Sequence, residues 1–160
     1  MKIIRKRKAK WGGQSLGKCL SPLTLTLLLL AFLPVTGRCT LDDALSFALE
    51  AASPYVKEGF TVREDYWGGD LPVAQPKAIV HQLFKGNEYW FWLGTDVDNA
   101  KISVHIYDSE GNLAEVESWQ KRHFSAARIV PKKTGSYYII VSIDKSENER
   151  THWALSYGFR

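Results

Sequence analysis

The sequence has few of the residues that form disulfides or bind metal ions in small proteins. Its 160 residues include two cysteines, of which Cys19 lies in the basic and apolar stretch that opens the chain. Residues 38–160 therefore keep one thiol, Cys39, and cannot close an internal disulfide. The four histidines are scattered, with no two at the spacing of a zinc site: His81, His105, His123 and His152. These absences argue against a disulfide framework, structural zinc and a Cys–His nucleophile.

Acidic residues are missing from the first part of the chain. Residues 1–37 carry seven Lys or Arg and no Asp or Glu, which leaves 14 Lys or Arg against all 17 acidic residues in 38–160, a net charge of −3. The overall charge of +4 thus belongs to the opening stretch. The rest of the chain lacks the basic surface that nucleic-acid binding requires, so we expect no nucleic-acid partner.

No apolar run is long enough to span a bilayer readily. Residues 23–33 are about half of the roughly 20 residues that a spanning helix needs. A basic region precedes this run, Pro34 follows it, and small residues up to Gly37 offer a cleavage site. The layout predicts a signal peptide over 1–37 and a bacterial protein that is periplasmic or secreted. It would meet the membrane only through the leader during export. The alternative is an uncleaved leader that anchors the chain in the membrane.

Cys39 lies two residues after Gly37, where cleavage is expected. A cysteine there suggests a lipoprotein, but the preceding Arg38 is a large cation where the lipidation pattern has a small residue. Cys39 is therefore a weak candidate for lipidation, and the other readings of this lone thiol are an inert side chain or a disulfide between chains.

Residues 59–160 show the period of β-strands. In Lys101–Asp108, apolar residues alternate with polar ones. In Trp153–Phe159, large apolar residues alternate with small ones. Glu88–Leu93 is apolar at most positions, as expected of a central strand covered on both faces. Further strands are expected at 59–66, 77–84, 112–119, 124–130 and 137–143, with a loop at 67–72 and a tight hairpin turn at 85–87. The pattern predicts an all-β fold, an antiparallel β-sandwich of jelly-roll type.

One helix is expected before the strands, within residues 38–58. Thr40 is a suitable N-cap, and acidic residues follow in the first turn. Small and apolar side chains then recur at helical spacing until Ser53-Pro54, where we expect the helix to end. Its small-residue face suits packing across a sheet.

Three segments together resemble the bacterial pre-peptidase C-terminal domain, a small β-sandwich appended to secreted proteases. They are Leu83–Tyr89, Val104–Leu113 and Ile129–Tyr138, and the similarity extends over about residues 78–158. The resemblance implies a non-catalytic module that binds matrix or substrate, or that assists export. The family often has acidic residues in the strand where this chain has Lys101 and Ser103, so the resemblance gives no support for a calcium site there.

Candidate binding residues are few. Asp96 and Asp98 stand two residues apart, a spacing found in calcium loops, although a solvated turn without any cofactor is the favoured interpretation. Trp67 and Trp119 are expected to be the most exposed of the tryptophans after the leader, where an indole can stack on a sugar or anchor a protein interface.

No catalytic motif occurs in the sequence. We therefore expect an exported, non-catalytic binding or envelope-accessory module with a protein or matrix partner. A carbohydrate-binding module that uses exposed aromatics is the alternative, and a hydrolase that uses clustered acids is the second alternative.

Overall fold

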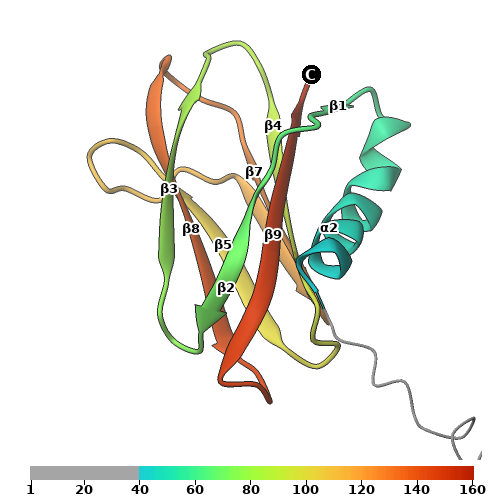
Figure 1. Cartoon of the computed structure of the whole chain (residues 1–160). Helices are drawn as coiled ribbons and strands as arrows, with labels where there is room; N and C mark the ends of the chain where they lie inside the picture. The colour runs from blue at the N-terminus through green and yellow to red at the C-terminus, as the bar shows by residue number, and fades with distance from the viewer. Residues whose placement is uncertain (1–39) are drawn as a thin grey trace, which may run out of the picture. The chain divides into compact units, whose positions relative to one another are not determined.

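In the computed structural model, which describes residues 40–160, two antiparallel sheets face each other and one helix covers the outer face of the larger sheet (Figure 1). The expected leader over 1–37 and Cys39 lie outside the described residues. The elements in chain order are α2 (Leu41–Val56), β1 (Thr61–Val62), β2 (Trp67–Pro72), β3 (Lys77–Leu83), β4 (Tyr89–Thr95), β5 (Lys101–Tyr107), β6 (Glu117–Lys121), β7 (Phe124–Ile129), β8 (Gly135–Lys145) and β9 (Arg150–Phe159).

The larger sheet has six strands and the smaller sheet three. The order in the larger sheet is β1-β9-β4-β7-β6, with β2 also paired to β9, and the order in the smaller sheet is β3-β8-β5. The strand pairs are antiparallel throughout. The prediction of an antiparallel β-sandwich with one N-terminal helix is confirmed.

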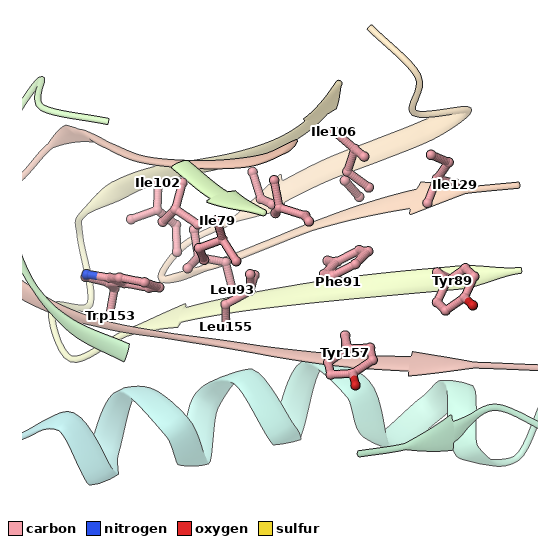
Figure 2. Packing of buried hydrophobic residues seen from close by; sticks show 14 of the residues in the cluster. Ile79, Tyr89, Phe91, Leu93, Ile102, Ile106, Ile129, Trp153, Leu155 and Tyr157 are labelled. Carbon is pink, nitrogen blue, oxygen red and sulfur yellow. The ribbon is translucent and has the colours of Figure 1, made fainter. Parts of the chain in front are cut away.

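Strand β4 lies at the middle of the molecule because both of its faces are covered. Tyr89, Phe91 and Leu93 face the smaller sheet and join the main core (Figure 2). Trp90 and Trp92 point the other way, into a second apolar cluster under the helix. The side chains of β4 are buried throughout, as the prediction of a strand covered on both faces requires.

The helix begins where the sequence predicts it. Thr40 and Asp43 form a capping box, in which the Thr40 hydroxyl accepts from the Asp43 amide and the Asp43 carboxylate accepts from the Thr40 amide. Ala44, Ala48 and Ala52 are its fully buried residues. Because these side chains are small, the helix axis can approach the sheet closely.

The predicted end of the helix at Ser53-Pro54 is wrong by about a turn. Pro54 lies inside the last turn and the helix continues to Val56. The proline ring fixes a φ that a helix accepts but removes one i→i−4 hydrogen bond, and the helix ends two residues later. The chain leaves the helix at Gly59, whose φ of +93° favours glycine.

The turn at residues 85–87 does not form the predicted hairpin. Gly86 has the expected positive φ of +100°, but it joins β3 in the smaller sheet to β4 in the larger one. Strand β3 pairs with β8 instead. A tight turn constrains the local backbone and leaves open which strands become neighbours, so the turn residues could not distinguish the two arrangements.

Three other local predictions differ from the structure. The strand expected at 59–66 is only the two-residue strand β1, Thr61–Val62. The segment Trp67–Pro72, expected to be a loop, is strand β2 and pairs with β9 along its whole length. The strand expected at 112–119 starts only at Glu117. Among residues 40–160, no helix combines the length and the apolar character needed to cross a membrane.

Candidate functional site

An open groove runs between helix α2 and the β6–β7 hairpin. We call it the helix-edge groove, and its volume is about 600 Å³. The helix contributes Glu50, Ala51, Pro54 and Tyr55, and the turn that follows it contributes Glu58. The hairpin contributes Trp119, Lys121, Arg122 and Phe124.

Aromatic rings form the floor of the helix-edge groove. The indole Nε1 of Trp119 donates to the Tyr55 hydroxyl oxygen at 3.0 Å, which joins the strand to the helix. The Tyr55 ring lies 4.7 Å from the Trp90 ring and 5.5 Å from the Trp92 ring, between centroids. Burial raises the pKa of Tyr55, against the opposing effect of the Trp119 hydrogen bond. The phenol is therefore neutral near pH 7 and retains its own proton for a hydrogen bond.

Charges of both signs stand on the rims of this groove. Glu50 projects from an exposed position on the helix and Glu58 from the exposed turn that follows it, while Lys121 and Arg122 project from exposed positions on the hairpin. None of the four belongs to an ion pair formed within residues 40–160. Their charges are available to a partner.

Strand β6 is an edge of the larger sheet. It pairs with β7 along Glu117–Lys121, and no strand of the described part of the chain pairs with its other side. Trp119 and Lys121 are two residues apart on β6, so they point to the same face of the sheet, the face that carries the helix. The groove therefore opens directly onto a free strand edge.

The structure places Trp67 far from this groove. Trp67 lies on β2, partly buried against the main core. Its ring centroid is 5.4 Å from that of Tyr157 and 5.1 Å from that of His81. The indole thus packs across the side of the sandwich where β2 and β3 approach each other.

The two tryptophans proposed from sequence do not form one platform. Trp67 pairs through β2 with β9, whereas Trp119 lies on β6 at the other end of the sheet order. They also pack in different apolar clusters, Trp67 with the inter-sheet core and Trp119 with the cluster under the helix. Both remain partly exposed, unlike Trp90, Trp92 and Trp153, which are buried.

The Asp96 and Asp98 carboxylates turn toward histidines. Asp96 is buried, and its Oδ2 lies 2.8 Å from Nδ1 of His152 on β9. Asp98 is exposed, and its Oδ1 lies 3.2 Å from Nδ1 of His123, although the direction is not that of a hydrogen bond. The two carboxylates hold the β4–β5 connection to two different parts of the larger sheet.

No common metal site includes these carboxylates in the structure. Within residues 40–160, no three His, Cys, Asp or Glu side chains gather closely enough to hold a metal ion. Calcium needs six to eight oxygen ligands, and Asp96 and Asp98 supply at most four. The prediction of a solvated turn without a cofactor, with calcium as its alternative, stays untested.

A second hollow, of about 510 Å³, lies between the 108–116 and 130–137 segments. Its notable residue is Glu115, whose side chain is 7% exposed. Glu115 accepts from the amide of Ile106 at 3.0 Å and lies 3.1 Å from Nδ1 of His105. These contacts hold the loop against β5, so Glu115 has a structural partner for each carboxylate oxygen.

Sequence reasoning missed the helix side of the helix-edge groove. Trp119 and the basic turn after it were recognisable, but Tyr55 lies 64 residues earlier in the chain. The pairing with Trp119 depends on tertiary packing, which the sequence pattern does not show.

A scan against models of known protein families and a search among curated proteins found no match for this chain. The resemblance to the pre-peptidase C-terminal domain therefore remains a prediction. The described residues define a class by structure: a small antiparallel β-sandwich with one helix across its larger sheet.

Proposed function

We propose that this chain is an exported, non-catalytic binding module, and that a protein or matrix partner docks in the helix-edge groove. The observation that carries the proposal is the combination of an aromatic floor with four charges that have no ion-pair partner within residues 40–160. Export rests on the leader-like composition of residues 1–37.

The chemistry of the groove suits recognition. Tyr and Trp side chains with an apolar ring and a polar tip are enriched at binding interfaces, and so is Arg. Tyr55, Trp119 and Arg122 supply these residue types within one hollow. Tyr55 and Trp119 are already fixed by their mutual hydrogen bond, so little side-chain entropy would be lost when a partner binds.

Carbohydrate binding is the second candidate, and the position of Trp119 favours it. Sugar sites combine an aromatic face with polar and charged groups that bond to hydroxyls, and the groove holds Trp119 together with Glu50 and Arg122. Trp67 takes no part in such a site, because its strand β2 pairs with β9, at the other end of the larger sheet from β6.

The groove acids do not favour a hydrolase. Glycosidases place two carboxyl groups about 5 to 10 Å apart. Glu50 lies on helix α2, whereas Glu58 lies in the turn that follows the helix, so the helix geometry does not fix the two carboxyl groups at that separation. Neither carboxylate is held by a hydrogen bond or ion pair from the described residues that would orient it for acid–base catalysis.

The proposal is tested by photo-crosslinking in bacterial cells that express the full chain. A photoreactive phenylalanine derivative replaces Lys121 at the groove or, as the control, Glu149 in the exposed β8–β9 turn. We expect discrete adducts from position 121 and none from position 149. No adduct from 121, or the same adducts from both positions, would contradict docking in the groove.

A further inference from the structure

We infer that the helix-edge groove receives an extended segment of a partner protein, which adds as a strand to the free edge of β6. This inference rests on the proposed function and specifies the partner class. It draws on three features that meet at one place: a strand edge without a partner strand within residues 40–160, an aromatic hollow beside it, and charges of both signs that form no ion pair in that part of the chain.

The strand edge supplies main-chain hydrogen bonds. An edge strand presents a row of backbone N–H and C=O groups to which another extended chain can bond. Residues Glu117–Lys121 of β6 are largely exposed and pair on one side with β7. A segment beside β6 would lie about 4.8 Å from it and would extend the larger sheet.

The groove supplies side-chain selectivity. Alternate side chains of an added strand point to the same face, so every second residue would face the helix side of the sheet. The ring floor of Tyr55, Trp119 and Phe124 lies on that side. An apolar side chain is the group that this floor would accept.

The unpaired charges define what flanks the apolar residue. Lys121 and Arg122 stand where β6 turns into β7, while Glu50 is on the facing helix and Glu58 is in the turn that follows it. Salt bridges tie the neighbouring Arg128 to Glu88 and Glu117, so the sheet does not use these four groove charges for its own stability. A segment with an acidic residue toward Lys121 and a basic residue toward the helix would be complementary to both walls.

A peptide can interact with the strand edge, the aromatic hollow and the charges, whereas a polysaccharide can interact with only one or two of them. A sugar chain can stack on Trp119 and bond to the carboxylates, but it has no alternating backbone donors and acceptors at strand spacing. The two classes also differ in the charge they require, because a neutral glycan has no need of opposite charges on the two walls.

The test uses the purified full chain and a phage-displayed library of random peptides. The selected peptides are synthesised and their affinities measured by fluorescence anisotropy. We expect them to contain an apolar residue between an acidic and a basic one. The variants Glu50→Lys and Lys121→Glu, at exposed positions, should each weaken binding about tenfold. Glu149→Lys, an exposed change in the β8–β9 turn, should leave it unchanged.

Two further measurements separate strand addition from other binding. A peptide with its acidic and basic residues exchanged should recover affinity for the double variant E50K/K121E. Amide hydrogen exchange should show protection of residues 117–121 when the peptide is bound. Far-ultraviolet circular dichroism confirms that each variant keeps the fold.

The inference is overturned if the library yields no peptide, if selected peptides ignore both charge variants, or if the β6 amides gain no protection. Loss of the position-121 adduct when the crosslinking is carried out in the presence of a polysaccharide such as xylan would also overturn it. In each of these cases an adduct from position 121 would leave the binding function standing, so the two proposals fail separately.

Discussion

Gly94 on β4 and Ala48 on helix α2 touch backbone to backbone. A Cβ atom built on Gly94 would lie 2.5 Å from the Ala48 amide nitrogen and would also overlap the Ala44 carbonyl oxygen. Real Cβ atoms do not approach backbone atoms this closely, so only glycine permits the observed separation of helix and sheet. The groove depends on this contact, since the helix forms one of its walls.

We predict that Gly94→Ala destabilises the fold by about 1 to 3 kcal/mol, the usual cost of overpacking, because the helix must move away from β4. Urea unfolding followed by circular dichroism measures the loss. Gly135→Ala is the matched control, since a Cβ at Gly135 meets nothing within 4 Å. Equal stabilities for the two variants would show that the helix does not pack as described.

Glu88 joins two arginines from different parts of the sheet. Arg128 donates to its Oε1 at 2.7 Å and Arg160 to its Oε2 at 2.8 Å. Burial raises the pKa of Glu88, but the hydrogen bonds from Arg128 and Arg160 outweigh it, so the pKa lies below the ordinary value of 4.5. A lowered pKa contributes stability above about pH 4.5, and this stability is lost as the pH falls through the lower folded-state value.

Glu88→Gln should therefore be less stable than the original chain at pH 7, by about 2 kcal/mol if two charge-assisted hydrogen bonds are weakened. The difference should shrink as the pH falls below 4.5, because Glu88 of the unfolded chain takes up a proton first and Glu88 of the folded chain does so at its lower pKa. Guanidinium unfolding at pH 7 and pH 3 compares the two chains. A difference that stays constant across this range would contradict a charged role for Glu88.

His81 is packed between rings, which disfavours its charged form. Its ring centroid lies 5.1 Å from that of Trp67 and 4.8 Å from that of Tyr157. Burial lowers the pKa of His81 below 6.5, while the Asp65 carboxylate acts in the opposite direction. Stability associated with neutral His81 is present above pH 6.5 and is lost as the pH falls through the lower folded-state pKa.

An NMR titration of the His81 ring should give a midpoint below 6.5. In Asp65→Asn the midpoint should fall further, because the charge that favours protonation has been removed. A midpoint above 6.5, or an upward shift in Asp65→Asn, would mean that the ring is more hydrated than its contacts indicate.

The sequence predicted the features that depend on neighbouring residues. Alternation identified β5 and β9, and Thr40 was identified as the helix cap. It could not predict features that depend on partners distant in the chain. Trp67 lies beside glycines that suggest a loop, and pairing with β9 makes the segment a strand.

The same distinction applies to the candidate site. Trp119 could be recognised as an exposed aromatic beside a basic turn. Tyr55 could not be joined to it, since the two meet only after the helix packs on the sheet. The groove forms only in the tertiary structure. In the sequence alone, the acidic residues of its helix wall have the pattern of an ordinary solvated helix face.

Calcium is expected to leave the stability of the chain unchanged. Asp96 Oδ2 lies 2.8 Å from His152 Nδ1, and Asp98 lies near His123, so a shared calcium would have to separate each carboxylate from its histidine. The ion would gain at most four carboxylate oxygens from these residues, fewer than the six to eight ligands it prefers. Thermal unfolding with millimolar calcium and with a chelator should give the same midpoint. A midpoint that calcium raises in the original chain, and no longer raises in Asp98→Asn, would instead establish a calcium site at the β4–β5 connection.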